Sequence, residues 1–407
     1  MRETSRKPSL RFAGFDDAWE QWKVSEVADR YDNLRVPIAA NLRVAGSTPY
    51  YGANGIQDYV EGFTHDGEFV LVAEDGANDL KNYPVKCVKG RIWVNNHAHV
   101  LQGKENICNN EFLAYSINQA DIESLLVGGG RAKLNADTMM NINLCLPSLR
   151  EQELLGKFTT NLDHLITLHQ RKYTKLTHVK KSMLEKMFPK DGASVPEIRF
   201  AGFTDAWAQR KLGQVLISLQ NNTLSRAELS YEQGVALNVH YGDVLIKFGE
   251  YLDIRKEALP RITDNSIVAK YRTSLLQNGD VIVADTAEDE TVGKCSEIAG
   301  LTDENVISGL HTIPYRPLMK FAAGYLGYYM NSESYHHQLL PLMQGIKVTS
   351  ISKGAMQNTI VNYPKSEDEQ AGISAFFRSL DHLITLHQRE LARLQNIKKS
   401  CLEKMFV

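Results

Sequence analysis

Two blocks of this sequence occur twice, and this duplication restricts the possible folds more than any other feature. The nine residues Asp163-His-Leu-Ile-Thr-Leu-His-Gln-Arg171 return letter for letter as residues 381–389. The block Arg11-Phe-Ala-Gly-Phe-Asp-Asp-Ala-Trp19 returns, with one change, as residues 199–207. The first block is shifted by 218 positions and the second by only 188, so the residues between the blocks differ in number. The chain therefore predicts two copies of a constant frame that carry two different inserts.

The length and composition are those of an ordinary globular protein. A chain of 407 residues predicts roughly two to three domains. No apolar run approaches the roughly 18 residues that span a bilayer, and the N-terminus lacks the apolar core of a signal peptide. The five cysteines are scattered without the spacing of a zinc site or a disulfide framework. We therefore expect a cytoplasmic protein without a metal site.

The charge is distributed unevenly along the chain. Residues 11–150 contain 13 Lys and Arg against 18 Asp and Glu, and residues 199–368 contain 16 against 19. The repeated segments are basic, with 7 against 4 in 151–188 and 6 against 4 in 369–407. Domains that bind nucleic acid unaided are usually strongly basic. If this chain binds DNA, we expect the isolated chain to bind it weakly.

Both inserts predict mixed sheets with tight turns. Apolar runs next to Gly and Asn turns are typical of short strands, and each insert ends in a strand before a proline, Pro147 or Pro364. The turns are expected at 53–55 and 75–76, where Gly or Asn tolerates positive φ. The predicted strands are 69–73, 91–94 and 142–146 in the first insert, and 242–246, 279–283 and 359–363 in the second. The two inserts should therefore have similar folds with divergent surfaces.

A long helix is predicted after each of these prolines. Acidic residues occupy the first turn of each, as the helix dipole favours. The apolar positions step by three and four residues, which indicates a narrow seam between paired helices. The predicted seam positions are Leu155, Phe158, Leu162, Leu165, Leu176, Val179 and Met183, and then Ile373, Phe376, Leu380, Leu383, Leu394, Ile397 and Cys401.

Polar residues interrupt both seams at their centres. These are His169 and Lys172 in the first helix, and His387 and Glu390 in the second. An antiparallel pairing would bring them together as a polar layer that fixes the helix register, at some cost in stability. Solvated edges of the seam are the alternative. A helix of about 35 residues would be on the order of 50 Å long, so the pair would hold the two inserts apart.

The chain is thus expected to be an α+β protein with two similar domains separated by a pair of long antiparallel coiled-coil helices, in a pseudo-two-fold arrangement. The first domain covers 1–150 and the first helix 151–188. A linker covers 189–198, the second domain 199–368 and the second helix 369–407.

The duplicated starts, the duplicated helices and their Leu-Glu-Lys-Met-Phe ends together resemble the DNA-specificity subunit of type I restriction–modification systems. The inserts are similar too, at 50–57, 72–76 and 93–100 in the first and at 345–348 in the second. The resemblance covers nearly the whole chain. It implies two target-recognition domains, each reading one half of an asymmetric bipartite DNA sequence.

The resemblance also implies partners. Two methyltransferase subunits would dock on the paired helices, and motor-nuclease (restriction) subunits would join them on double-stranded DNA in the bacterial cytoplasm, associated with the nucleoid. S-adenosylmethionine, ATP and Mg²⁺ would be held by those partners, and this chain would hold no cofactor and catalyse nothing. The sequence agrees, because it contains neither an Asn-Pro-Pro-aromatic methylation motif nor a Gly-x-x-x-x-Gly-Lys-Ser/Thr phosphate loop.

Side chains suited to DNA contact occur in both inserts. Amide side chains can pair with adenine edges, and tyrosine and basic side chains can contact phosphate. Turn formation and core packing are the alternatives for the tyrosines and amides. The candidates are Tyr50, Tyr51, Asn54, Gln57, Lys81, Arg91, Asn95, Asn96, Arg131 and Lys133 in the first insert, and Lys247, Arg255, Lys347 and Lys353 in the second.

Two motifs have competing interpretations. His97-x-His99 can ligate a metal, but no further ligands stand at suitable spacing, so a hydrogen-bonded loop is expected. The Gly-rich segment 128–133 matches 344–347 in position, each ahead of the final strand of its insert, and such a turn can approach a phosphate backbone closely.

Two other functions compete with DNA recognition. One is a two-headed adaptor that binds proteins through its inserts, and the other is a fused methyltransferase–nuclease. The missing catalytic motifs and the chain length disfavour the fusion.

Overall fold

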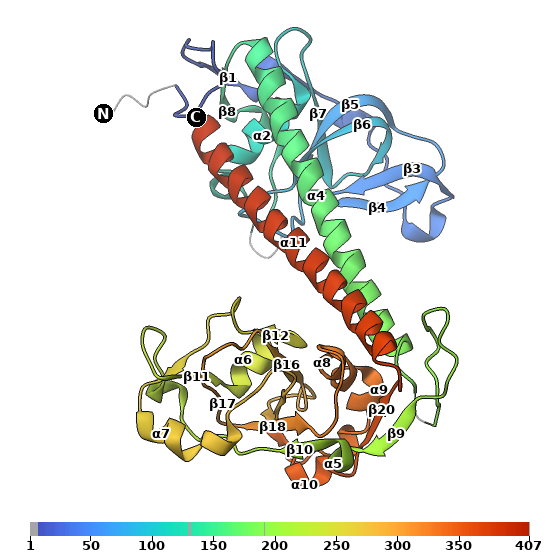
Figure 1. Ribbon diagram of the computed structural model, residues 1–407. Helices are drawn as coiled ribbons and strands as arrows, with labels where there is room; N and C mark the ends of the chain where they lie inside the picture. Colours follow the sequence, from blue (N-terminus) through green and yellow to red (C-terminus); the bar gives the residue numbers. More distant parts are fainter. Residues whose placement is uncertain (1–6, 129–131, 191, 407) are drawn as a thin grey trace. The chain divides into compact units, whose positions relative to one another are not determined.

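The computed structural model describes residues 7–128, 132–190 and 192–406. These residues form two compact units. Unit 1 comprises Met1–Arg171 with Gln388–Val407, and unit 2 comprises Lys172–His387. Each unit contains one insert and a part of both long helices, α4 (Leu149–Lys186) and α11 (Glu367–Met405) (Figure 1).

Unit 1 is built on a six-stranded sheet in the order β2-β7-β5-β6-β3-β4. A separate pair, β1 with β8, connects the start of the insert to its end. The elements are β1 (Glu20–Lys23), α1 (Val24–Val27), β2 (Ala28–Arg30), β3 (Ala45–Gly52), β4 (Gly55–Val60), β5 (His65–Ala73), β6 (Val85–Val94), β7 (Ala98–Gly103), α2 (Asn110–Gln119), α3 (Ala136–Met140) and β8 (Asn143–Leu146).

The sheet of unit 1 is covered on both faces. Along β5, Phe69 and Leu71 pack in one apolar cluster, whereas Val70 and Val72 pack in another. Successive side chains of a strand point to opposite faces, so a strand buried on both faces has a continuous apolar sequence. Helix α2 packs on β5 and β6. Burial of both faces of β5 explains the apolar run that predicted this strand.

Unit 2 is built on a five-stranded sheet in the order β10-β18-β14-β16-β12, with smaller sheets beside it. The elements are β9 (Ala208–Lys211), α5 (Leu212–Val215), β10 (Leu216–Ser218), β11 (Ala236–Val239), α6 (Tyr241–Ile246), β12 (Tyr251–Asp253), β13 (Arg261–Ile262), α7 (Asn265–Lys270), β14 (Val281–Ala284), β15 (Thr286–Ala287), β16 (Cys295–Ala299), β17 (Val306–Ser308), β18 (Thr312–Pro317), α8 (Tyr325–Met330), α9 (Glu333–His336), β19 (Thr349–Ser350), α10 (Lys353–Met356) and β20 (Ile360–Tyr363).

The main sheets of the two units have the same topology. From β2 to β3 in unit 1, three antiparallel pairings are followed by one parallel pairing. From β10 to β12 in unit 2, the same order of pairings occurs. The pair β9–β20 corresponds to β1–β8. The prediction of two similar α+β inserts is confirmed, and the inserts differ in what is added to this common sheet.

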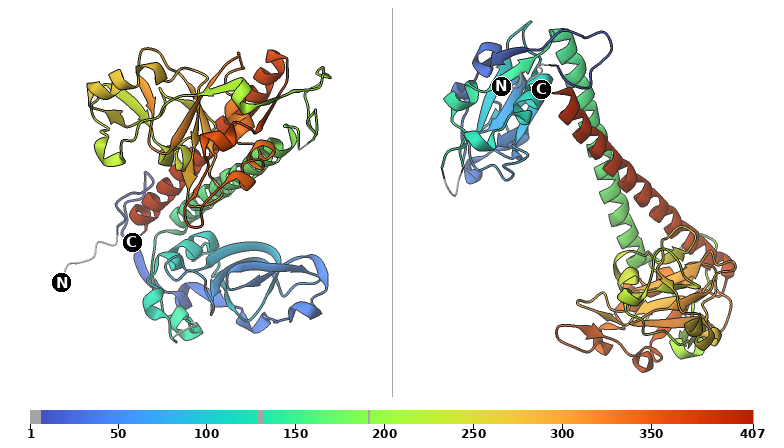
Figure 2. Two further views of the ribbon diagram at one scale, coloured as in Figure 1. Left: turned by 90° about the horizontal axis from the view of Figure 1, so that it is seen from below. Right: turned by 90° about the vertical axis from the view of Figure 1, so that its left-hand side faces the viewer.

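The two long helices run antiparallel within each unit, because rising residue numbers in α4 meet falling numbers in α11 (Figure 2). This confirms the predicted pairing. The contacts are Asp163 with Lys398 and Leu155 with the core around Met405 in unit 1, and Lys180 with Asp381 and Phe188 with Phe377 in unit 2.

A line of buried and half-buried side chains follows each helix in steps of four and three residues. Its phase differs from the predicted seam, because Ile166 and Ile384 are half-buried while their neighbours Leu165 and Leu383 are exposed. Adjacent apolar residues permit both phases, and only the packing selects one. The line is Leu155, Thr159, Leu162, Ile166, His169, Tyr173, Leu176, Lys180 and Met183 in α4, and Ile373, Phe377, Leu380, Ile384, His387, Leu391, Leu394, Lys398, Cys401 and Met405 in α11.

The strand predicted at 242–246 is wrong, because these residues lie in helix α6. The His240 side chain accepts a hydrogen bond from the Gly242 amide and caps the helix, and Asp243 occupies its first turn. Ile246 is exposed, so the apolar run does not mark a buried strand. The other predicted strands coincide with, or lie largely within, β5, β6, β8, β14 and β20. Within the described residues, no helix has the length and apolar character needed to span a membrane.

Candidate nucleic-acid interface

The duplicated Arg-Phe-Ala-Gly-Phe block connects the start of each insert to the long helix that follows that insert. Arg11 donates two hydrogen bonds of 2.7 Å to Glu151 on α4. Arg199 donates bonds of 2.7 and 2.9 Å to Glu369 on α11. Both glutamates are buried, and a two-pronged arginine–carboxylate pair fixes geometry as well as charge. The same arginine–glutamate contact therefore connects the insert to a long helix in both units.

A second repeated cluster joins the nine-residue segments to the inserts. In unit 1 the Tyr115 hydroxyl donates to Asp163 at 2.5 Å, and Lys398 forms an ion pair with the same carboxylate at 2.5 Å. In unit 2, Tyr328 donates to Asp381 at 2.6 Å, and Lys180 pairs with it at 2.6 Å. The lysine ammonium also lies 5.6 Å from the Tyr115 ring and 5.7 Å from the Tyr328 ring, for Lys398 and Lys180.

Two of the predicted DNA contacts on β3 lie inside the fold. Tyr50 is 1% exposed, and its hydroxyl accepts a hydrogen bond from the Ile38 amide at 3.0 Å. Tyr51 is buried in the cluster on the sheet. The prediction that these tyrosines contact DNA is not supported by their positions, because the protein itself covers both side chains. Core packing, the alternative interpretation, describes them.

The two amide side chains next to the β3–β4 turn differ in their contacts with the rest of the protein. Asn54 donates to the Gly76 carbonyl at 2.9 Å and accepts from the Asn78 amide at 2.9 Å, so it connects two turns. Gln57 is exposed and accepts a long bond of 3.4 Å from Asn95. Their contact with DNA stays a prediction.

The segment after β6 is a hydrogen-bonded loop. Asn95 is buried and accepts from the His97 amide at 2.8 Å, so it shapes the loop and is not placed to reach DNA. Asn96 is exposed, and its contact with DNA stays a prediction. His97 and His99 contact different carboxylates, Asp75 and Asp32, each at 2.7 Å.

His99 belongs to a buried charge cluster on β7. A ring nitrogen of His99 lies within 4.8 Å of carboxylate oxygens of Asp32 and Glu74. Arg35 and Lys133 already pair with Glu74, at 2.7 and 2.9 Å. Burial raises the pKa of both carboxyl groups, but hydrogen bonds from His99 and the Val100 amide to Asp32, and from Lys133 and Arg35 to Glu74, outweigh it and hold both pKa values below their ordinary values. The cluster is therefore an ion-pair network in which lysine and arginine occupy the place of a cation.

Two of the four basic candidates of unit 1 are paired with acids. Lys133 binds Glu74, and Arg91 donates to Asp66 at 3.2 Å while it lies 4.7 Å from the Phe63 ring. Lys81 is exposed. Arg131 lies outside the described residues. DNA contact by these four residues stays a prediction.

The basic candidates of unit 2 differ in whether their side chains form hydrogen bonds or ion pairs within the protein. The two nitrogen atoms of Arg255 each lie 2.9 Å from Asp253, and Lys247 donates to the Ala258 carbonyl at 2.5 Å. Lys353 donates to the Leu219 carbonyl at 2.9 Å. Lys347 is exposed and has no hydrogen bond or ion pair within the described part of the chain. Lys347 is thus the most available of the four.

Lys347 lies on a loop that has a counterpart in unit 1. An antiparallel bridge between Gln344 and Ser350 closes the loop, and a bridge between Val127 and Lys133 closes the other. Both loops begin with a glycine of positive φ, 117° at Gly345 and 97° at Gly128, as a tight turn requires. The flanking bridges agree with the predicted match in position, but residues 129–131 lie outside the described residues, so the match of the segments themselves stays a prediction. Ile346 and Val348 beside Lys347 are also exposed.

The four residues of the predicted polar layer do not all face the seam. His169 and His387 stand on the half-buried lines of α4 and α11. Lys172 is exposed, and the half-buried position beside it is held by Tyr173. Glu390 lies 3.7 Å from Arg393 of the same helix. The assignment of Lys172 to the seam is corrected, and the role of the other three in register stays a prediction.

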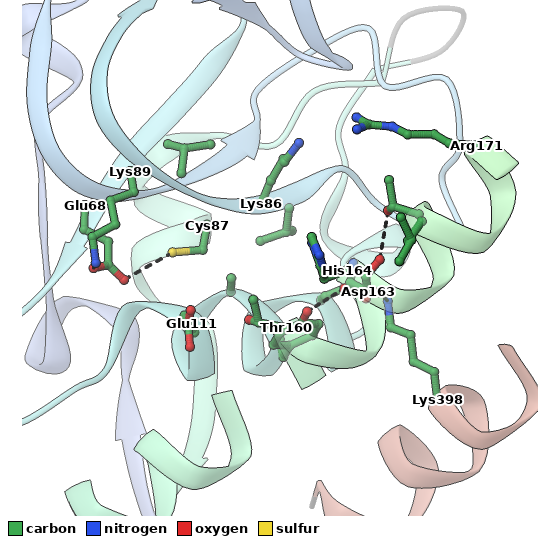
Figure 3. Close-up of a pocket in the computed structure, with 17 residues that line it drawn as sticks. Glu68, Lys86, Cys87, Lys89, Glu111, Thr160, Asp163, His164, Arg171 and Lys398 are labelled. Atoms are coloured by element: carbon green, nitrogen blue, oxygen red, sulfur yellow. Dashed lines mark hydrogen bonds and ion pairs between the residues drawn. The ribbon is translucent and has the colours of Figure 1, made fainter. Parts of the chain in front are cut away.

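A cleft of about 470 Å³ lies in unit 1 between β5–β6, α2, α4 and the end of α11. Five of its lining residues come from the nine-residue segment that is duplicated letter for letter: Asp163, His164, Thr167, Leu168 and Arg171. Lys86, Cys87 and Lys89 of the insert line the facing wall (Figure 3). One wall of the cleft is therefore formed by the duplicated segment, and the facing wall is formed by the insert.

The cleft is suited to binding and not to covalent chemistry. Burial raises the pKa of the Cys87 thiol to about 12, so the sulfur is a protonated, weak nucleophile. Burial also raises the pKa of the Tyr115 hydroxyl. Asp163 is engaged by Tyr115 and Lys398.

Sequence reasoning missed the charged residues at one end of this cleft. Lys86, His164 and Arg171 line it, and their side chains form no hydrogen bond or ion pair with any described residue. The signal for His164 and Arg171 was present, because the duplicated segment retains every letter. The predicted seam accounts only for the apolar positions of that segment. Lys86 carried no such signal, because only the fold brings β6 beside α4.

Comparison with known proteins agrees with this organisation. Residues 16–178 match the family model of the type I restriction modification DNA specificity domain. A type I restriction enzyme specificity subunit from Haemophilus influenzae is 46% identical over 149 residues, which cover 36% of this chain and 38% of that protein. The type I restriction enzyme MjaVIII specificity subunit of Methanocaldococcus jannaschii is 23% identical over 405 residues, which cover 93% of this chain and 91% of that protein.

A solved structure has the same fold. The S subunit of a type I restriction–modification system from M. genitalium superposes with a TM-score of 0.61 at 14% identity, over 98% of this chain and 99% of that one. The family domain, the two halves on one frame and the extended likeness to MjaVIII agree. Residues 16–178 therefore belong to the type I restriction modification DNA specificity domain family, and the chain is similar over most of its length to type I restriction enzyme specificity subunits.

Proposed function

We propose that this chain recognises the DNA sequence for a type I restriction–modification complex. One observation carries the proposal. Two sheets that share the topology of five strands are joined to long helices by repeated pairs, Arg11–Glu151 and Arg199–Glu369, while the surfaces that they present differ. A constant frame with two different faces suits a protein that applies one assembly to two different half-sites.

Each insert would read one half of an asymmetric, bipartite target. Both inserts are acidic overall, so little of the non-specific attraction to DNA can come from them. Two methyltransferase subunits would supply the clamp and most of the salt-dependent affinity, and motor-nuclease subunits would join for restriction. S-adenosylmethionine, ATP and Mg²⁺ would be bound by those subunits, and this chain would act without catalysis in the cytoplasm, where its DNA is found.

Methylome sequencing tests this function. A bacterial host would carry the chain together with the methyltransferase subunit of its system. We expect one methylated bipartite motif, which disappears when the chain is deleted. A matched variant with residues 199–368 replaced by the insert of a relative should change one half-site and keep the other. Methylation that persists without the chain would refute the proposal, and a change in both half-sites would refute the one-insert, one-half-site assignment.

The long helices would set the distance between the half-sites. Insertion of seven residues after Gln170 and after Gln388, which are equivalent positions of the duplicated segment, keeps the four-and-three spacing of both half-buried lines. Seven residues add about 10 Å of helix, or about three base pairs of B-DNA. We expect a longer spacer between unchanged half-sites. A four-residue insertion, which breaks the spacing, is the control.

A further inference from the structure

The cationic end of the unit 1 cleft has an unusual arrangement of charge. Figure 3 shows the ammonium group of Lys86 and the guanidinium group of Arg171 pointing toward one another, with His164 pointing into the cleft. Like charges repel, and both side chains are exposed at the cleft. Within the described residues no carboxylate forms an ion pair with either cation. An anion between them would offset this repulsion.

The acids that line the cleft are engaged elsewhere or lie apart. Asp163 is bound by Tyr115 and Lys398, and Glu68 pairs with Lys89 at 3.2 Å. Glu111 lies at the opposite end from Arg171 (Figure 3). Glu68 and Glu111 thus lie at one end of the cleft and Arg171 at the other, while Asp163 is already paired with Lys398.

The source of each cation favours a sequence-independent anion. Arg171 and His164 belong to the segment that is identical in both halves, so they suit a ligand that is the same at both half-sites. Every DNA sequence shares the phosphodiester backbone. Phosphate contacts by arginine and lysine fix the position of a protein on the duplex without reading bases. The planar fork of arginine also matches phosphate geometry.

We propose that Lys86, His164 and Arg171 bind a backbone phosphate of the DNA recognised by unit 1. This inference rests on the proposed DNA recognition and adds a phosphate seat that includes the constant helix. The helix would thereby contact the DNA as well as space the inserts. The insert would contribute one cation, and the frame would contribute the other two groups.

The test measures how DNA affinity depends on salt. The full chain would be titrated with a 30-base-pair duplex of random sequence by fluorescence anisotropy, at about six NaCl concentrations from 25 to 200 mM. Lys86→Gln and Arg171→Gln are the variants. Lys157→Gln is the matched control, because Lys157 is an exposed cation of the same helix that does not line the cleft. Thermal unfolding would verify that all variants fold.

Each cleft variant should lower the slope of log affinity against log salt by about 0.9, and the control by much less. One lost contact corresponds to roughly eightfold weaker binding at 0.1 M salt, relative to 1 M. The factor should be equal on a target duplex and on the random one. Unchanged slopes, or no DNA binding by the wild-type chain at 25 mM NaCl, would overturn the phosphate seat.

The partner subunits provide the remaining arm of the test. If Arg171→Gln leaves the salt slope unchanged but weakens association with the methyltransferase subunit, the cations bind an acidic protein surface and the proposal is wrong. Failure of the proposed function would look different, because methylation would then not depend on the chain at all. A normal methylome with unchanged slopes would reject the phosphate seat alone.

Discussion

The two units place the same frame against different inserts, and the difference is clearest beside the Tyr–Asp–Lys clusters. The strand registers make Lys86 and Cys87 of unit 1 equivalent to Ser296 and Glu297 of unit 2. Lys86 is exposed at an open cleft, whereas Ser296 is buried and donates to the Gly249 carbonyl at 2.7 Å. The insert thus decides whether the constant helix face is open or covered.

A second difference lies in the residue that follows each Leu-Glu-Lys-Met sequence. Phe188 is fully buried in unit 2, between Trp207, Tyr329 and other rings, and stacks on Phe377 at 5.9 Å. Its duplicate Phe406 is half-buried in unit 1. We therefore expect the duplicated phenylalanine to contribute more to stability in unit 2, where the aromatic cluster is denser. Three pairs of variants and one single variant test how far the halves differ.

The largest difference should follow removal of the duplicated phenylalanines. We expect Phe188→Ala to lower the free energy of unfolding by about 3–5 kcal/mol, because it leaves a cavity among packed rings. Phe406→Ala should cost roughly 1–2 kcal/mol, because its side chain is already partly exposed. Urea unfolding, followed by hydrogen exchange of peptides from each unit, measures both. Equal losses would show that the two aromatic clusters are energetically alike.

The duplicated lysines should differ next. Lys180 pairs with Glu250 at 2.7 Å as well as with Asp381, whereas the described partner of Lys398 is Asp163 alone. Lys180→Met leaves two carboxylates close together without a cation, at a cost of about 2–4 kcal/mol.

The matched variant Lys398→Met should cost about 1 kcal/mol, because Tyr115 still donates to Asp163. The same unfolding experiment compares them. The double variant Lys180→Met with Glu250→Gln should recover part of the loss. If it recovers nothing, charge repulsion is not the cause.

The third difference concerns pH. Burial raises the pKa of Glu297 to about 7, although the Gly324 and Gly327 amides donate to its carboxylate and oppose the shift. Its ordinary pKa is 4.5. A raised pKa means that the stabilising contribution of the neutral acid is complete below pH 4.5 and is lost as the pH rises to about 7.

Glu297→Gln stays neutral and should lose this pH dependence. Relative to the variant, wild-type unit 2 should therefore become less stable by about 2–3 kcal/mol between pH 4.5 and 7.5. Hydrogen exchange of unit 2 peptides at several pH values checks this. His240, whose pKa burial lowers, is present in both proteins, so it does not affect the comparison. A constant difference across the range would contradict the assignment to Glu297.

The frame was predictable because its signals are local. Duplicated letters, acidic first turns and apolar spacing predicted the helices, their pairing and the strands at the ends of each insert. The seam phase was not predictable, because Leu165 and Ile166 are adjacent and equally apolar. The strand predicted at 242–246 failed because the cap at His240 depends on a side-chain contact that apolar spacing does not register.

The binding surface was less predictable, because availability depends on partners far away in sequence. Tyr50 is covered through a contact with Ile38, and Lys133 is neutralised by Glu74, which lies 59 positions earlier. Arg171 carries no ion pair within the described residues, and residue type alone cannot distinguish it from Arg199, which Glu369 binds. Function could be inferred from the repeats, whereas the individual contacts required the fold.

The smallest expected difference separates the two equivalent loops. Lys347 is free within the described residues, whereas Lys133 is bound to Glu74 and, through it, to the charge cluster around His99. Lys347→Gln should therefore lower the salt slope of DNA binding by about 0.9, or roughly eightfold in affinity at 0.1 M salt relative to 1 M, without changing stability. Lys133→Gln should leave the slope nearly unchanged and destabilise unit 1 slightly. Anisotropy titrations and thermal unfolding of both variants give the comparison. If Lys133→Gln lowers the slope as much as Lys347→Gln does, DNA competes successfully with Glu74, and the paired cations of unit 1 must be counted with the free ones.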